Sequence, residues 1–213
     1  PKFAYPVPDA MAPGFKYDPL GGSYTVNIGQ NDDHYTGLIN GSSQVKTPIF
    51  GYGTGGSYTW PGMTFEVQSF LSTTVTWNNQ LGYSHLLPVD ESLHWAYSLH
   101  GYEGKNIGNT GVPIITHVHG SHVDFQFDGN PEFFYNPGAT VVGPQWAKVP
   151  GGFTNQFTYD NSQPAGTVWY HDHALGITRL NVYAGMAGFY IIRDDYDSGL
   201  AGNDLGLPVW PYE

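Results

Sequence analysis

Two pairs of histidines have a spacing that could hold a metal ion. The first pair is His117 and His119 in IITHVHGSH, and the second is His171 and His173 in WYHDHALGITRL. On a β-strand, residues i and i+2 face the same way, so each pair would project two imidazoles together. If the two strands meet, four imidazoles converge, and neutral imidazole is a ligand for copper, zinc, iron or nickel.

A single His-x-His segment is more often part of a half-exposed strand than a metal site. Two such segments in one small β domain favour a metal site, because four clustered imidazoles are hard to satisfy by hydrogen bonds alone. The intervening residues, Val118 and Asp172, are expected to point to the opposite face of their strands.

Other polar side chains are weaker candidates. Asp128, in FQFDGNPEFF, follows the first pair. Asp-Gly is an ordinary turn, but a carboxylate beside a metal centre can also relay protons or orient a bound water. His122 is close enough in sequence to support the first pair. His34 is predicted to be solvated, and packing or hydrogen bonding is predicted for His85, His94 and His100.

The elements that must position these residues are predicted to be strands. The 213 residues include 29 Gly, 16 Pro and 16% aromatic side chains, which is typical of many short strands joined by turns. Alternation in stretches such as MTFEVQSF predicts an all-β, antiparallel Greek-key sandwich or barrel over about residues 31–195, and ALGITRLNVYAG predicts a helical turn. Residues 1–30 are predicted to form an extended arm, and 196–213 a tail or linker.

Composition excludes several function classes. Seven Lys plus Arg against 18 Asp plus Glu give a net charge of −11, so a nucleic-acid surface is not expected. No apolar run reaches the length of a transmembrane helix. The sequence contains no cysteine, which excludes disulfides and thiolate metal ligands.

Several motifs together resemble one family. THVHG, FDGNPE and WYHDHALGITRLNVYAGMAGFYIIRD resemble the amino-terminal cupredoxin domain of multicopper oxidases, in the branch of spore-coat laccases, bilirubin oxidases and phenoxazinone synthases. TPIFGYG, MTFEVQ, TWNNQL and LLPVDESLHW occur in the same order as in that domain. The resemblance covers about residues 44–213.

The resemblance implies a cupredoxin-like fold and an oxidase that uses dioxygen. Such enzymes oxidise a reductant, often a small aromatic molecule, at a type 1 copper, and reduce dioxygen to water at a trinuclear cluster held by four His-x-His motifs. Carried over, His117 would bind the type 2 copper, and the type 3 coppers would be bound by His119, His171 and His173. Asp128 falls where relatives place an acid that assists proton delivery.

The sequence also departs from the family pattern. A type 1 site needs a cysteine thiolate, and only two of the four His-x-His motifs are present. We therefore expect activity only with a partner chain that supplies the type 1 site and the remaining cluster histidines. Family habit indicates a secreted or extracytoplasmic location.

Two alternatives stay open at this point. A jelly-roll protein with His-x-His ligands could hold a single zinc or iron ion and act as a hydrolase or oxygenase. The chain could also be a non-catalytic copper-binding or structural module.

Overall fold

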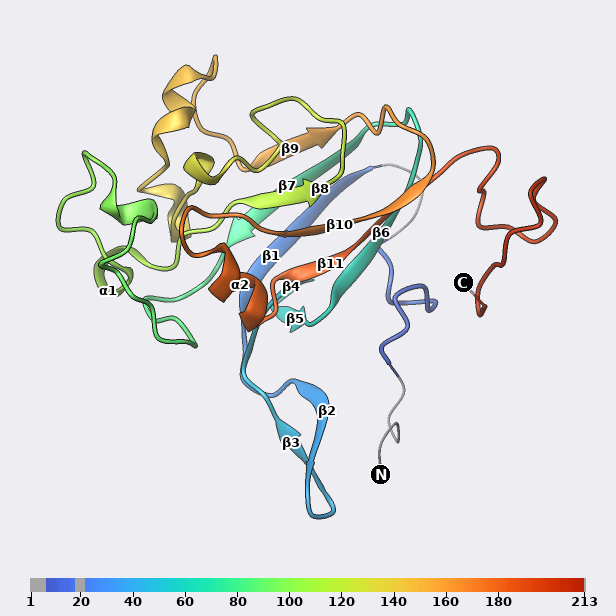
Figure 1. Ribbon diagram of the computed structural model, residues 1–213, viewed down its shortest axis with the longest axis horizontal. Coiled ribbons are helices and arrows are strands. Elements are labelled where there is room, and N and C mark those ends of the chain that lie inside the picture. Colours follow the sequence, from blue (N-terminus) through green and yellow to red (C-terminus); the bar gives the residue numbers. More distant parts are fainter. Residues whose placement is uncertain (1–6, 18–21, 213) are drawn as a thin grey trace.

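The computed structural model describes residues 7–17 and 22–212, and strands dominate them (Figure 1). The first sheet contains, in spatial order, β5 (Ser57–Thr59), β4 (Ile49–Thr54), β1 (Ser23–Asn31), β7 (Thr73–Asn79) and β9 (Gln156–Tyr159). The second contains β6 (Gly62–Gln68), β11 (Ala187–Arg193), β10 (Gly166–Asp172) and β8 (Thr116–His119). A separate hairpin, which projects from the body in Figure 1, consists of β2 (Tyr35–Asn40) and β3 (Ser43–Lys46).

Helices are short in the described part of the chain. The α-helical segments are α1 (Ile107–Thr110) and α2 (Thr178–Ala184), and the second of these confirms the predicted helical turn. The 3-10 segments are η1 (Ala96–Ser98), η2 (Pro131–Phe133), η3 (Pro137–Ala139) and η4 (Pro144–Lys148). None of the helices in residues 7–17 and 22–212 is long and apolar enough to cross a membrane.

Alternating side chains place the core between the two sheets. On β6, Phe65 and Val67 are buried while the residues between and after them face outward, as the alternation predicts. The ring of Tyr170 on β10 lies 4.8 Å from that of Tyr52 and 5.6 Å from that of Trp77, both on the facing sheet. Burial of such large aromatic rings is a major part of the stabilisation of a sandwich. The all-β prediction is confirmed.

The prediction that all strands pair antiparallel is wrong. β1 pairs with β7, and β6 pairs with β11, in parallel. Each of these pairs joins strands that are distant in sequence. Alternation reports which face of a strand is buried, but it carries no information about the direction of the neighbouring strand.

The predicted boundary between arm and domain at residue 30 is also wrong. β1 (Ser23–Asn31) lies in the middle of the five-stranded sheet, between β4 and β7. Its Val26 and Ile28 are fully buried, so a period-two pattern was present among the glycines and polar residues. Residues 1–6 and 18–21 of the predicted arm lie outside the described residues.

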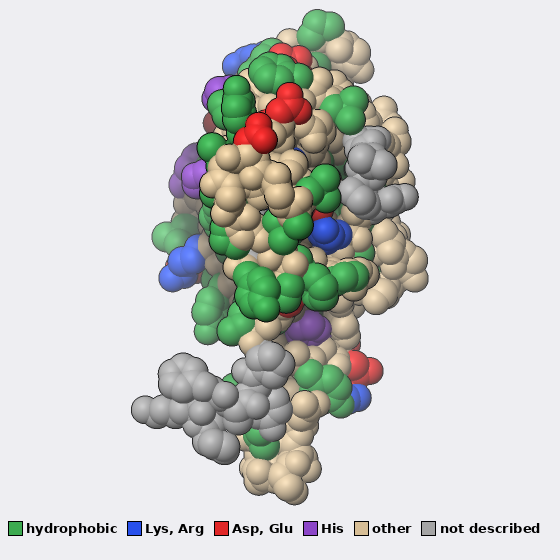
Figure 2. Space-filling model, turned by 90° about the vertical axis from the view of Figure 1, so that its right-hand side faces the viewer, with side chains coloured by type: hydrophobic (Ala, Val, Ile, Leu, Met, Phe, Trp, Pro, Cys, Tyr) green, Lys and Arg blue, Asp and Glu red, His purple; other side chains and the backbone are tan. Residues whose placement is uncertain are grey.

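The two ends of the described chain approach each other. The backbone of Lys16 forms an isolated parallel β-bridge with Thr64 of β6, and the Tyr17 side chain is buried against the core. The indole Nε1 of Trp210 donates to Asp9 Oδ2 at 2.8 Å. Figure 2 shows this side of the molecule, where apolar side chains interrupt the polar surface. Residues 196–212, predicted as a tail, contain neither helix nor strand.

Candidate metal centre

Strand pairing brings the two histidine pairs together. β8 runs antiparallel to β10, with His117 directly opposite His171 and His119 opposite Trp169. Val118 and Tyr170, the alternate residues, are fully buried in the core. The histidines therefore share the face of the sheet that points away from the core.

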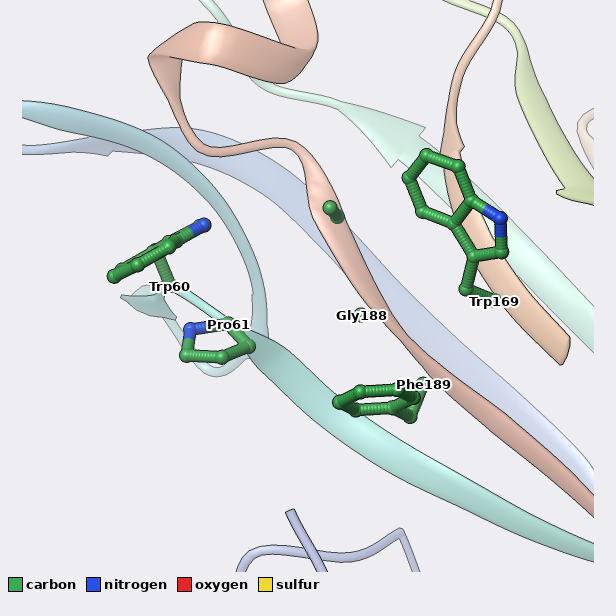
Figure 3. Close-up of a pocket in the computed structure, with 6 residues that line it drawn as sticks. Trp60, Pro61, Trp169, Gly188 and Phe189 are labelled. Carbon is green, nitrogen blue, oxygen red and sulfur yellow. The ribbon is translucent and has the colours of Figure 1, made fainter. Parts of the chain in front are cut away.

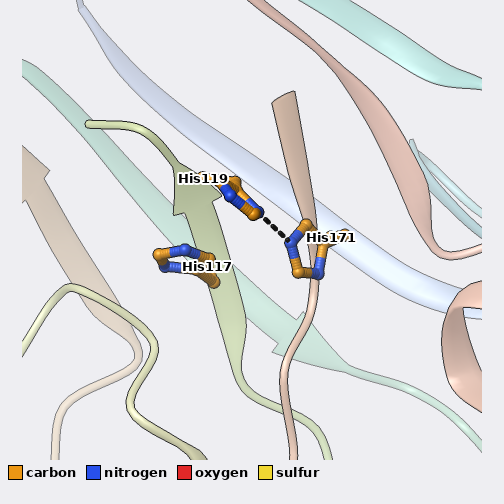
Figure 4. Close-up of side chains that lie close together, drawn as sticks. All are labelled: His117, His119 and His171. Carbon is orange, nitrogen blue, oxygen red and sulfur yellow. Dashed lines mark hydrogen bonds between the residues drawn. The ribbon is translucent and has the colours of Figure 1, made fainter. Parts of the chain in front are cut away.

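Three imidazoles already have the geometry of a ligand set. One ring nitrogen from each of His117, His119 and His171 lies within 4.8 Å of the others (Figure 4). His119 Nδ1 and His171 Nε2 are 3.3 Å apart. Two nitrogens that bind one ion at about 2.0–2.1 Å, at a tetrahedral angle, are separated by about 3.4 Å. This pair thus fits a single transition-metal ion.

His173 joins this group from beyond the end of β10. Its ring centre lies 5.1 Å from that of His117 and 5.7 Å from that of His171. Its Nδ1 is buried and has no hydrogen-bond partner among the described residues. A buried imidazole nitrogen left without a partner is costly unless an ion binds there. The structure thus gathers all four imidazoles; which copper each would bind stays a prediction.

Hydrogen bonds orient two of the rings. His171 Nδ1 donates to the carbonyl of Asp172 at 2.7 Å, and His117 Nδ1 donates to the carbonyl of Asp128. In a neutral imidazole, a protonated Nδ1 leaves the lone pair of Nε2 free for a metal. The backbone thereby selects the tautomer that can act as a ligand through Nε2.

Burial keeps these imidazoles in the neutral, ligating form. It lowers the pKa of His171 to about 4 and also lowers the pKa of His117 and of His173. The neighbouring imidazoles also lower the pKa of His171, because a positive charge on one ring disfavours a positive charge on the next. Near neutral pH, protons therefore do not compete with a metal for these rings.

The Asp128 loop packs on the first pair. Asp128 Oδ1 lies 3.4 Å from His117 Nδ1, and half of the Asp128 side chain is exposed. Gly129 has φ +73°, and a Cβ there would lie 2.5 Å from His117 Cβ. Only glycine allows the loop to approach so closely. The Asp-Gly dipeptide thus indicated a loop that packs against His117. Gly129 was not identified from the sequence as a residue of the site.

The second pair rests on a buried carboxylate. Asp172 is fully buried on the core face and accepts hydrogen bonds from Ile115 N and Asn181 Nδ2. Burial raises its pKa to about 7, against the opposing effect of these hydrogen bonds. Asn181 was not identified from the sequence. Because Asp172 was predicted to point to the core face, a hydrogen-bond donor for its carboxylate was to be expected.

The other histidines have ordinary surroundings. His122 is exposed, and its Nδ1 approaches the carbonyl of Ser162 at 3.3 Å. His85 packs edge-on against Phe50, and burial lowers its pKa. His100 is exposed beside Glu103. The prediction that His85 packs and forms hydrogen bonds is confirmed.

An apolar groove adjoins the histidines on the same sheet face. It has a volume of about 310 Å³ and is lined by Trp60, Pro61, Trp169, Ala187, Gly188 and Phe189 (Figure 3). The Trp169 ring lies 4.1 Å from the His171 ring and 5.6 Å from the His119 ring, centre to centre. Trp60, Trp169 and Phe189 each remain more than one-third exposed.

Comparisons with known proteins agree with this geometry. Residues 107–197 match the family described as multicopper oxidase, and this range includes all four histidines and Asp128. Multicopper oxidase LPR1 of Arabidopsis thaliana is 40% identical over 148 residues, which are 69% of this chain and 23% of the relative. A laccase of Bacillus subtilis is 35% identical over 141 residues, 66% of this chain and 25% of the relative. The chain spans about a quarter of the length of these relatives.

Solved structures show the same fold. A laccase from Pediococcus acidilactici superposes with a TM-score of 0.51 at 21% identity, covering 84% of this chain and 27% of the laccase. A multicopper oxidase from Campylobacter jejuni, titled a metallo-oxidase, gives 0.50 at 20% identity, covering 80% and 25%. Fold and histidine geometry define a cupredoxin-like β domain with a candidate metal site. The chain carries a domain of the multicopper oxidase family, as the motifs indicate.

Proposed function

We propose that this domain supplies four of the eight histidine ligands of a trinuclear copper cluster in a laccase-like oxidase. The observation that carries the proposal is the convergence of His117, His119 and His171 on one sheet face, with the His173 ring beside them. When complete and loaded, such a cluster reduces dioxygen to water with electrons from a type 1 copper.

The four imidazoles divide between two kinds of copper in this proposal. His117 would hold the type 2 copper, and the type 3 coppers would be held by His119, His171 and His173. The 3.3 Å separation between His119 Nδ1 and His171 Nε2 supports a shared ion for those two residues. Neutral imidazoles with free nitrogens suit copper, which prefers nitrogen ligands at such sites.

Asp128 has the position of a proton-transfer residue. Its carboxylate is 3.4 Å from His117 Nδ1, and half of the side chain reaches solvent. A carboxylate that contacts both a ligand and water can hold a proton at Oδ1 and pass it toward the centre. Its backbone carbonyl separately orients the His117 ring. The side chain and main chain of Asp128 would thus serve different purposes.

A partner polypeptide would complete the centre. The sequence has no cysteine, so the thiolate of a type 1 site and the remaining four histidines would come from outside these 213 residues. The apolar groove beside the histidines supports a partner surface, because exposed apolar patches commonly mark interaction sites. In this arrangement the reductant, a small aromatic molecule, is oxidised at the partner's type 1 copper.

The test is intact mass together with metal content on natively purified protein. A second, cysteine-containing polypeptide with about four coppers per complex would support the proposal. A single zinc or iron ion per chain would replace it with a one-metal enzyme. A folded species without bound metal and without oxidase activity would leave only a structural module.

A further inference from the structure

The end of β10 poses a positioning problem. β10 ends at Asp172, so His173 lies beyond the regular ladder although it must share a face with His171. Two backbone hydrogen bonds continue past this point: Asp172 N donates to Met186 O at 3.3 Å, and His173 N donates to Ile115 O at 2.8 Å. Backbone hydrogen bonds also shape the turn that follows, where Leu175 N donates to Pro131 O at 3.3 Å and Ile177 N donates to Ala174 O at 3.1 Å.

The Asp172 side chain ties three segments together. Oδ1 accepts from Ile115 N, just before β8, at 3.0 Å, while Oδ2 accepts from Ala174 N at 3.1 Å and from Asn181 Nδ2 on α2 at 2.9 Å. The carboxylate therefore joins the start of β8, the turn after β10 and α2. The Asp172 carbonyl also accepts from His171 Nδ1, so one residue orients a ligand ring and the following turn.

Asn181 is held in a single orientation. Its Nδ2 also donates to Pro113 O at 3.1 Å, and its Oδ1 lies 3.0 Å from His85 Nε2. Leu87 N donates to His85 Nδ1 at 2.9 Å, so in the neutral ring the proton is on Nε2 and is donated to Asn181 Oδ1. A reversed amide would place its NH2 against the His85 N–H donor and its oxygen against the acceptor oxygens of Pro113 and Asp172.

We propose that Asp172 and Asn181, with His85 behind them, form a positioning network that aims His171 and His173 at the metal centre. The proposal rests on the proposed function, in which these two histidines bind copper. The three residues touch neither metal nor substrate, so they act through the ligands. Residues behind metal ligands typically change metal affinity by about 10–100-fold when they are mutated.

Asn181→Asp tests the network with little change in shape. It removes both amide donors and places a second carboxylate beside Asp172. Asn161→Asp is the matched control, because Asn161 is also buried and its Nδ2 also donates twice, to Leu71 O and Thr73 Oγ1. Both variants lose two side-chain hydrogen bonds of a buried amide, but only Asn181 contacts the segment that carries the metal-binding histidines.

The measurement is the rate at which EDTA removes copper from the natively loaded protein. We expect Asn181→Asp to lose copper about 10–100-fold faster than wild type. Asn161→Asp should lose copper at the wild-type rate, even if its melting temperature falls as far. Equal rates in the two variants would overturn the proposal, since copper loss would then follow stability alone.

A second measurement separates this proposal from the proposed function. In metal-stripped native protein, the imidazole NMR signals of His171 and His173 should shift in Asn181→Asp and stay in place in Asn161→Asp. Unshifted signals would overturn the network even if copper binds. Wild-type protein that binds no copper would instead remove the proposed function, while the imidazole signals would still report whether the network positions the rings.

His85 should contribute through Asn181. His85→Leu removes the donor to Asn181 Oδ1, whereas His85→Gln retains an amide donor on a side chain of similar reach. We expect faster copper loss in His85→Leu and near-wild-type loss in His85→Gln. Identical behaviour of the two variants would exclude His85 from the network.

Discussion

The two histidine pairs share one motif but are held by different means. His117 and His119 lie on β8, the edge strand of the second sheet, whereas His171 lies on β10, which is paired on both sides. His117 receives its hydrogen-bond partner from the Asp128 loop, eleven residues away. His171 receives its partner from the adjacent carbonyl of Asp172, above a buried polar network.

This difference teaches that identical spacing does not imply identical support. The β8 pair depends on a loop that packs on it from outside, and His119 itself is exposed. The β10 pair depends on the protein interior. Substitutions around β8 are therefore expected to act through loop placement and proton access, and those around β10 through ligand geometry.

The largest effect should come from removing a ligand of the interior pair. We expect His171→Ala or His173→Ala to reduce oxygen consumption by the assembled protein more than about a thousandfold, because these rings would bind the cluster. The domain should stay folded, with a melting temperature within about 4 °C of wild type. His100→Ala, at an exposed histidine, is the control. Full activity in either ligand variant would refute the assignment.

A smaller effect is expected when the packing of the Asp128 loop against β8 is disturbed. In Gly129→Ala the new Cβ would lie 2.5 Å from His117 Cβ, so the Asp128 loop must move. We expect a loss of about 1–3 kcal/mol in the free energy of unfolding from this overpacking, and reduced copper content. Urea unfolding and metal analysis would measure the two.

Gly152→Ala is the control for this substitution. Gly152 has φ +74°, almost the same as Gly129, but a Cβ there has nothing within 4 Å. Alanine at position 152 would therefore have a similar positive φ to alanine at position 129, but its Cβ would meet no neighbouring atom. Equal losses in the two variants would show that packing of the loop on His117 contributes nothing.

Asp128→Asn should affect turnover without affecting the metal. The backbone carbonyl that orients His117 remains, but the side chain can no longer carry an acidic proton. We expect kcat to fall by about tenfold or more, with copper content unchanged. Steady-state kinetics and metal analysis on the same sample would decide. Loss of copper instead would make the role of this carboxylate structural.

The smallest effect should come from the far edge of the same sheet, which neither pair contacts. Glu66 on β6 accepts from Lys16 and Arg193 at 2.5 and 2.8 Å. Burial favours a higher pKa for this carboxyl, but the hydrogen bonds and charges of the two bases prevail and hold its pKa below the ordinary value. Because the folded-state pKa is lowered, the stabilisation is complete above about pH 4.3 and is lost as pH falls through the folded-state pKa.

Glu66→Gln should therefore reduce stability by about 1–2 kcal/mol at pH 7 and have less effect in acid. Urea unfolding at several pH values would measure this. If the difference in unfolding free energy between wild type and Glu66→Gln is the same at pH 7 and pH 3, the ion-pair explanation is contradicted. Copper content should not change, which makes this variant a reference for the substitutions around the two histidine pairs.

The sequence by itself determined the local features of this protein. Period-two alternation predicted strands such as β6 and their buried side chains, although β1 was missed, and the His-x-His spacing predicted that each pair projects to one side. Both predictions follow from the geometry of a single strand. The absence of cysteine excluded a type 1 site within these 213 residues, and the motif from Trp169 to Asp194 was long enough to indicate the family.

Only the tertiary structure decided how these local features combine. The adjacency of β8 and β10, the parallel pairs and the central place of β1 depend on contacts between segments far apart in sequence, which alternation does not encode. The same holds for Gly129 against His117 and for Asp172 against Asn181. Side chains acquire these partners only when separate elements pack, so hydrogen bonding and close contact between elements completed the site that spacing had outlined.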